Sequence, residues 1–146
     1  MNTTKSYEPM SQTNTIPKIL YVDDDTDDFN FLKDTFAAES VDASMVCASN
    51  GDEAIEYLDK TRECLPSLII LDLNMPGRDG KQTLKYIKSS PQLSSIPVVI
   101  LSTSQSRIDK EVCKKLGAAS YLEKPNHYDG YRQVVERCVP LIRHAS

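Results

Sequence analysis

The stretch LIILDLNMPG, residues 68–77, is the part of the sequence from which the fold can be worked out. Four consecutive apolar residues end at Asp72, and Pro76 and Gly77 follow shortly after it. A short apolar run closed by proline and glycine is typical of a buried strand that ends in a loop. In an open α/β sheet, chemistry is placed outside the carboxyl ends of the strands. We therefore predict that Asp72 lies at that edge, and we interpret it as a carboxylate that becomes phosphorylated.

Apolar runs alternate with helical patterns on both sides of this stretch. Further strands are predicted at residues 19–22, 43–48, 98–101 and 119–122. Each strand is followed by apolar residues at helical spacing, so the pattern is β–α repeated five times. The central runs are apolar throughout, as expected for strands buried on both faces. These features predict an α/β fold with a parallel sheet and helices on both of its faces.

Polar residues indicate where several of the helices begin. Asn50, Asp79 and either Ser104 or Ser106 are predicted to be N-caps, because their side-chain oxygens can accept a backbone N–H of the first turn. The last helix is predicted from about residue 126 to residue 142, with a kink near its end at Pro140.

Length, composition and charge exclude several classes of protein. The 146 residues are 40% hydrophobic and 26% charged, which fits one globular domain. We expect that domain over residues 17–143, after a polar, flexible N-terminal tail at residues 1–16. A net charge of −4 without a basic cluster argues against nucleic-acid binding. No apolar run approaches the ~20 residues of a membrane span and no signal peptide is visible, so we expect a cytoplasmic protein.

Polar residues whose side chains can bind a metal ion or take part in a reaction follow four of the predicted strands. The first strand ends at Asp23 and Asp24, the third at Asp72, the fourth at Ser102 and the fifth at Lys124. In a parallel sheet these strand ends converge at one edge. An all-oxygen set of carboxylates suits Mg²⁺. A metal ion and an ammonium would neutralise phosphoryl oxygens, so the set fits phosphoryl transfer to Asp72 as nucleophile.

These motifs resemble those of response-regulator receiver domains of two-component signalling. The matches are VDD at 22–24, LDLNMPGRDG at 71–80, LS at 101–102 and YLEKP at 121–125. The resemblance covers about residues 17–143 and implies a flavodoxin-like, doubly wound (βα)5 fold with strand order 2-1-3-4-5. The acidic run at residues 23–28 is similar to the start of small standalone receivers that partner phytochromes.

The resemblance also implies a metal site and a phosphoacceptor. Asp72 resembles the residue that is phosphorylated. Asp23 and Asp24 resemble metal ligands, acting together with Asp72 and the backbone carbonyl of Asn74. The implied cofactor is Mg²⁺, with Mn²⁺ as a substitute.

Three further residues match positions that assist or report phosphorylation. Lys124 resembles the family's catalytic lysine, and the bond from it to Pro125 matches one that is cis in the family. Ser102 stands at the position of a hydroxyl that bonds the phosphoryl group. Together with Tyr121, it matches the pair of residues that changes conformation when the protein is phosphorylated.

The expected function is that of a single-domain response regulator that catalyses only its own phosphorylation and dephosphorylation and has no other enzyme activity. A sensor histidine kinase or a histidine phosphotransfer protein would supply the phosphoryl group. The chain ends soon after the last helix, so we expect no attached output domain and signalling by contact with a downstream protein. A homodimer is compatible with this expectation, through the face of the helix that starts at Ser104 or Ser106, the strand at 119–122 and the last helix at about 126–142. Two alternatives stay open: an intermediate shuttle in a multi-step phosphorelay, and a phosphorylation-independent pseudo-receiver that serves as an interaction module.

Overall fold

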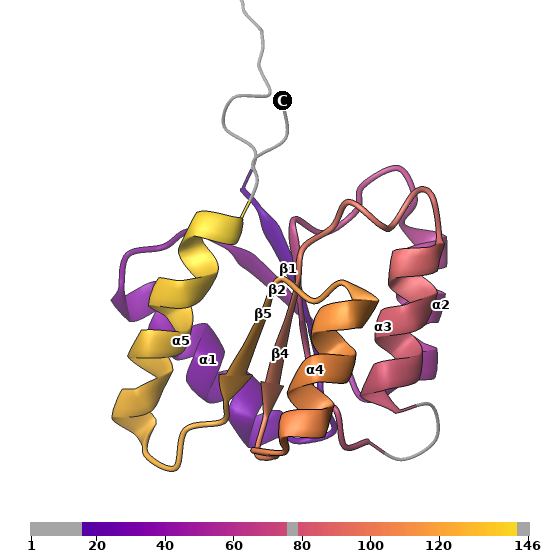
Figure 1. Ribbon diagram of the computed structural model, residues 1–146. Coiled ribbons are helices and arrows are strands. Elements are labelled where there is room, and N and C mark those ends of the chain that lie inside the picture. The colour runs from indigo at the N-terminus through magenta and orange to yellow at the C-terminus, as the bar shows by residue number, and fades with distance from the viewer. Residues whose placement is uncertain (1–15, 76–78, 143–146) are drawn as a thin grey trace, which may run out of the picture.

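Five strands form one parallel sheet in the computed structural model, which describes residues 16–75 and 79–142 (Figure 1). The strands are β1 (Lys18–Val22), β2 (Ser44–Ala48), β3 (Leu68–Leu71), β4 (Val98–Ser102) and β5 (Ser120–Glu123). They pair in the order β2-β1-β3-β4-β5, and every pair is parallel. The α/β class and the flavodoxin-like strand order predicted above are confirmed.

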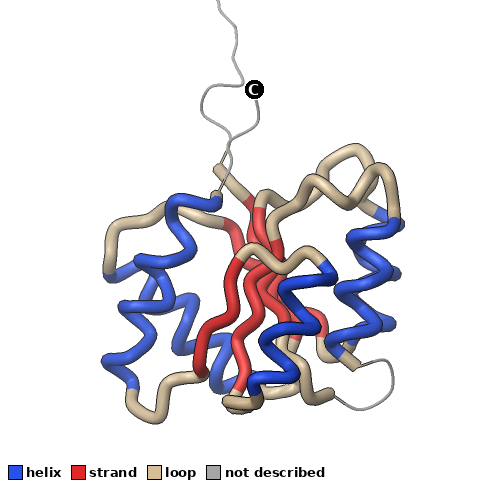
Figure 2. Tube along the Cα trace, in the orientation of Figure 1, coloured by secondary structure: helices blue, strands red, loops and turns tan. Residues whose placement is uncertain are grey.

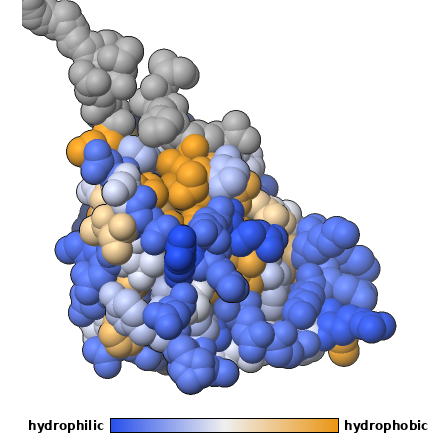
Figure 3. Space-filling view, turned by 90° about the vertical axis from the view of Figure 1, so that its left-hand side faces the viewer, coloured by the Kyte–Doolittle hydropathy of each residue, from blue (hydrophilic) through white to orange (hydrophobic). Residues whose placement is uncertain are grey.

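Helices cover both faces of the sheet. They are α1 (Thr26–Ala38), α2 (Gly51–Lys60), α3 (Gly80–Ser89), α4 (Arg107–Leu116) and α5 (Tyr131–Cys138). Helices α1 and α5 lie on one face and α2, α3 and α4 on the other (Figures 1 and 2). The outer surface of the α1 and α5 side is mainly hydrophilic (Figure 3), since these helices direct most of their apolar residues at the sheet. Within the described ranges, no helix combines the length and apolarity that crossing a bilayer requires.

The apolar run at residues 68–71 forms the central strand β3, which is buried on both faces. Leu68 and Ile70 belong to the core under α1 and α5, whereas Ile69 and Leu71 belong to the core under α2, α3 and α4. All four side chains are fully buried, because successive residues of a strand point to opposite faces and both faces are covered. Because β3 is packed on both faces, it fixes the position of Asp72 at the edge of the sheet.

The predicted helix starts are confirmed at α2, α3 and α4. Asn50, Asp79 and Ser106 each accept a hydrogen bond from the backbone N–H three residues later, at 2.9, 2.9 and 3.2 Å. Of the two serines considered for α4, Ser106 is therefore the N-cap.

The last helix is shorter than predicted. Its α-helical part is Tyr131–Cys138, with one 3₁₀ turn before it at Tyr128–Gly130 and another after it at Val139–Leu141. Pro140 lies in the second 3₁₀ turn. Because proline has no N–H to donate to the carbonyl four residues earlier, the α-helix gives way to the tighter turn. Residues 1–15 of the predicted tail and the turn at 76–78 lie outside the described residues.

Candidate functional site

Three carboxylates meet at the carboxyl ends of β1 and β3. These strands are neighbours, and the backbone N–H of Asp72 donates to the carbonyl of Val22 at 2.9 Å. Carboxylate oxygens of Asp23, Asp24 and Asp72 all lie within 4.8 Å of one another. Asp23 and Asp72 are buried and Asp24 is exposed, so the cluster opens to solvent on one side. An all-oxygen donor set of this kind fits a hard divalent cation such as Mg²⁺ or Mn²⁺.

The loop after β3 places backbone N–H groups beside the carboxylate of Asp72. Those of Leu73 and Asn74 lower the pKa of this carboxyl group, because they favour its ionised form. Asn74 is exposed and follows Asp72 by two residues, so its backbone lies beside the acidic cluster. The role of its carbonyl as a metal ligand stays a prediction.

Lys124 reaches the same cluster from the end of β5. Its Nζ lies 2.7 Å from Asp23 Oδ2, 2.9 Å from Asp28 Oδ2 and 4.0 Å from Asp72 Oδ2. The backbone N–H of Lys124 donates to the carbonyl of Ser102 at 2.8 Å, which ties this strand end to β4. Burial alone would lower the pKa of Lys124, but its two carboxylate partners outweigh burial and raise that pKa above its usual range. The ammonium is therefore charged at neutral pH.

Ser102 and Tyr121 are joined through the loop between β4 and α4. The Oγ of the fully buried Ser102 accepts a hydrogen bond from the N–H of Ser104 at 3.0 Å. The hydroxyl of Tyr121 donates to the carbonyl of Ser104 at 2.9 Å. The hydroxyl of Ser104 donates to Asp109, which also pairs with Lys81 of α3. One serine thus connects the two residues that were predicted to form a switch.

A family model described as the response regulator receiver domain matches residues 19–136. This chain belongs to the response-regulator receiver family. Receiver domains are signalling modules that bind Mg²⁺ or Mn²⁺ at an acidic pocket and interact with histidine kinases or phosphotransfer proteins. The resemblance seen in the sequence motifs is confirmed.

Relatives of this receiver include proteins of different length. It is 32% identical to response regulator Rcp1 of Synechocystis sp. over 132 residues, which cover 87% of this chain and 90% of Rcp1. It is also 32% identical to the transcriptional regulatory protein CpxR of Escherichia coli over 126 residues, which cover 86% of this chain but 49% of CpxR. The CpxR match therefore concerns only about half of that protein.

Solved structures of receivers superpose closely on this one. The Mn²⁺-bound form of Rcp1 has 27% identity and a TM-score of 0.79, with 89% of this chain and 99% of that chain covered. The phosphorylated cyanobacterial phytochrome response regulator RcpA has 31% identity and a TM-score of 0.80, with 90% and 100% covered. Both solved chains are therefore matched over almost their whole length.

Three residues of the receiver site were not singled out from the sequence. Asp28 is the second carboxylate on Lys124, and the hydroxyl of Tyr131 donates to its Oδ1 at 2.8 Å. The hydroxyl of Tyr21 donates to Asp23 Oδ2 at 2.8 Å. Tyr21 could have been found, because residues two apart in a strand share a face. Asp28 enters the sequence interpretation only through the acidic run at residues 23–28, and no sequence signal links it to Tyr131.

The environment of Asp72 raises the free energy of its ionised form. Burial raises the pKa of Asp72 to about 6, and the nearby charge of Asp23 adds to this effect. Lys124 and the two loop amides act in the opposite direction without cancelling it. The receiver therefore keeps a carboxylate at this edge that is less stable when ionised than an exposed one would be.

We expect Asp72→Asn to stabilise the metal-free protein. The ordinary pKa of this group is 3.8, so between this value and about 6 the folded form keeps a proton that the unfolded chain has lost. Raising the pH through this window consequently favours unfolding. Removing the carboxylate should raise the free energy of unfolding by about 1–3 kcal/mol at about pH 7.5 and by much less at about pH 4. Urea denaturation in EDTA at both pH values measures the difference.

The control for this experiment is Asp42→Asn, which removes an exposed carboxylate outside the site. It should leave stability nearly unchanged at either pH. An equal effect of Asp72→Asn at both pH values would contradict the expected pH dependence.

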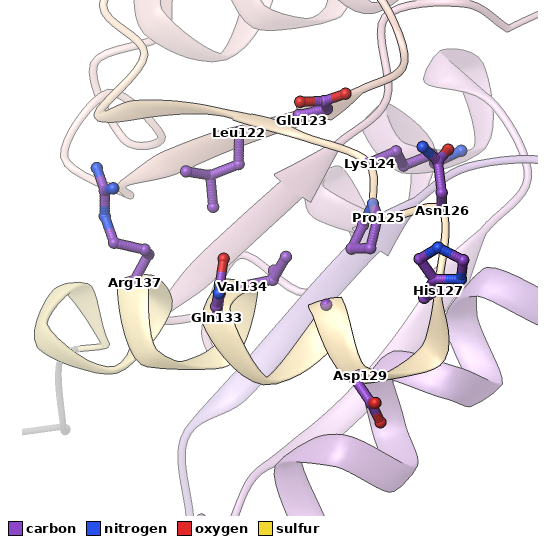
Figure 4. A pocket seen from close by; sticks show the side chains of 11 residues that line it. Leu122, Glu123, Lys124, Pro125, Asn126, His127, Asp129, Gln133, Val134 and Arg137 are labelled. Atoms are coloured by element: carbon purple, nitrogen blue, oxygen red, sulfur yellow. The ribbon is translucent and has the colours of Figure 1, made fainter.

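A cavity of about 550 Å³ lies between the end of β5 and α5, beside the site (Figure 4). Lys124, Pro125 and Gln133 are among its lining residues, whereas Asp23 and Asp72 are not.

The peptide bond between Lys124 and Pro125 is trans, which corrects the cis bond implied by the resemblance. Trans is the intrinsically preferred isomer before proline, by about 0.5–1 kcal/mol.

Proposed function

We propose that this receiver accepts a phosphoryl group on Asp72 from a phosphohistidine of a sensor kinase or of a phosphotransfer protein. Asp23, Asp24, Asp72 and the backbone carbonyl of Asn74 would hold Mg²⁺, which supplies positive charge to the phosphoryl oxygens when bound. The observation that carries the proposal is the cluster of three carboxylates within 4.8 Å, with the Lys124 ammonium 4.0 Å from Asp72.

The chain's own residues have distinct tasks in this reaction. A carboxylate oxygen of Asp72 attacks phosphorus, the P–N bond of the phosphohistidine breaks, and the imidazole leaves with the bonding electron pair. The product on this chain is an acyl phosphate. Lys124 stabilises the negative charge on the transferred oxygens. Hydrolysis of the acyl phosphate later restores the free carboxylate.

Ser102 and Tyr121 would convert phosphorylation into a change of surface. The Ser102 hydroxyl would hydrogen-bond the phosphoryl group, and this competes with the bond that its Oγ now accepts from Ser104. Because Tyr121 is bonded to the carbonyl of Ser104, movement of this loop would release or reorient the tyrosine. Phosphorylation then shifts an equilibrium between two arrangements of the loop.

We further propose that residues 17–143 act in the cytoplasm as a standalone response regulator that signals by protein contact. The match to Rcp1 over 90% of its length and to RcpA over 100% supports this role. Tyr121 lies on β5, so the surface of α4, β5 and α5 would receive the downstream protein or serve a homodimer. Transfer of the phosphoryl group from Asp72 to a purified phosphotransfer protein would instead identify a relay shuttle.

Labelling with acetyl phosphate and Mg²⁺ tests the proposed function. The wild type should form an acid-stable, hydroxylamine-labile adduct, because an acyl phosphate has this chemistry. Asp72→Asn should lose the adduct by about a hundredfold or more, since it removes the nucleophile. Asp42→Asn should label like the wild type. A wild type without the adduct would refute the proposal and favour the phosphorylation-independent module.

A further inference from the structure

The second carboxylate on Lys124 is itself held in place. Oδ2 of Asp28 lies 2.9 Å from Nζ of Lys124, and Oδ1 accepts the hydroxyl of Tyr131 at 2.8 Å. The backbone N–H of Asp28 donates to the cap residue Asp25 at 3.3 Å. Tyr131 is only 3% exposed and lies on α5, which packs against α1. The two oxygens of Asp28 thus join α1, α5 and the end of β5.

An acid in the first turn of a helix also stabilises the helix dipole, so this alternative must be separated from a role in the site. The neighbouring Asp27 occupies the same turn of α1 and carries the same charge, but it is exposed. Asp28 is the member of this pair that faces the ammonium. A dipole effect would be shared by both residues, whereas contact with Lys124 belongs to Asp28.

The distances show what this contact does to Lys124. An ammonium has three donors, and the two short contacts to Asp23 and Asp28 account for two of them. The third contact, to Asp72, is 4.0 Å, longer than a direct hydrogen bond. Without Asp28, the carboxylates left to attract Lys124 would be Asp23 and Asp72. The ammonium would then move toward Asp72 and pair with the oxygen that must attack phosphorus.

We propose that Asp28, anchored by Tyr131, is a positioning residue that holds Lys124 within reach of the transferred phosphoryl group but off the Asp72 nucleophile. This inference rests on the proposed function. It adds a residue from α1, and an anchor from α5, to the set that prepares the site for phosphoryl transfer. The contribution is one of geometry, since misplacement of a catalytic group by about 1 Å can slow a reaction by about a hundredfold.

Kinetics of labelling give the first test. The initial rate of Asp72 phosphorylation is measured over a series of acetyl phosphate concentrations at saturating Mg²⁺. Asp28→Ala should lower the limiting rate by about tenfold or more, and Tyr131→Phe by about threefold, with the half-saturating concentration nearly unchanged. The matched control Asp27→Ala should behave like the wild type. If Asp28→Ala does not fold, Asp28→Asn should still show a lower limiting rate than Asp27→Asn.

The position of the ammonium gives a second test that needs no reaction. In ¹⁵N-labelled protein without acetyl phosphate, the Lys124 ammonium signal, assigned by its loss in Lys124→Arg, should shift in Asp28→Ala and stay in place in Asp27→Ala. A purely structural role in α1–α5 packing would lower the unfolding temperature without moving this signal.

Two results would overturn the inference: an unmoved signal, or a wild-type limiting rate in Asp28→Ala. If the wild type itself is not labelled, the proposed function fails. The ammonium signal then still decides whether Asp28 positions Lys124.

Discussion

Lys124→Met is expected to slow phosphorylation of Asp72 by about a hundredfold or more and to destabilise the metal-free protein by about 3 kcal/mol. The kinetic loss follows because the variant has no ammonium to stabilise the transferred oxygens. The loss of stability follows because Asp23 is 1% exposed and Asp28 17% exposed in their side chains, and both would lose their cation. A buried ionised group without a partner costs far more than an exposed one. Acetyl phosphate kinetics and urea denaturation in EDTA measure the two effects.

Lys60→Met is the matched control, because it removes the same charge from an exposed pair. Lys60 lies 3.9 Å from Glu56, with both side chains about two-thirds or more exposed, and such pairs contribute little. We expect this change to lower the free energy of unfolding by less than about 0.5 kcal/mol. Saturating Mg²⁺ should reduce the loss of stability in Lys124→Met, since a cation then neutralises Asp23 and Asp72. A loss of the same size with and without Mg²⁺ would show that the unpaired charge of buried Asp23 is not its cause.

The strand pattern could be predicted closely because burial on both faces leaves a direct mark in the sequence. The bounds of β3 agree with the apolar run at residues 68–71, since polar residues flank it on both sides. The last helix could not be delimited in the same way. Its apolar stripe continues past Cys138, but Pro140 removes a donor, and this turns the final residues into a 3₁₀ turn. Periodicity reports which face is buried, whereas the hydrogen-bond pattern decides where the helix ends.

The site could be predicted as far as strand ends bring residues together. Topology alone places four of the predicted residues at the same edge as Asp72, because they lie at the ends of strands that are neighbours or near neighbours of β3. They are Asp23, Asp24, Ser102 and Lys124. The contact between Asp28 and Tyr131 joins residues 103 positions apart. It depends on how α1 packs against α5, which no local pattern encodes. The missing part of the site is therefore the part that is built by helix packing.

Gly80→Ala should destabilise the fold by about 3 kcal/mol, although alanine is normally favoured over glycine in helices by about 0.5–1 kcal/mol. Gly80 is the first residue of α3 and packs directly against the loop that carries the nucleophile. A Cβ at this position would lie 2.3 Å from the carbonyl oxygen of Asp72 and 2.6 Å from the Cα of Leu73. Both neighbours are backbone atoms at the end of the central strand, so neither can turn away as a side chain could. Urea denaturation measures the loss.

The same substitution should slow phosphorylation, because relief of the clash requires movement of the Asp72 backbone. We expect the rate with acetyl phosphate to fall by about tenfold or more, since a small displacement of a reacting group is costly. Gly117→Ala is the control, because Gly117 has a φ of +106° at the end of α4 and the nearest atoms to its Cβ would belong to the flexible side chain of Lys88. That variant should lose about 1–2 kcal/mol of stability through backbone strain and keep the wild-type rate. If Gly80→Ala kept the wild-type phosphorylation rate, whether or not its free energy of unfolding fell, the position of Asp72 would not depend on the contact between α3 and the loop after β3.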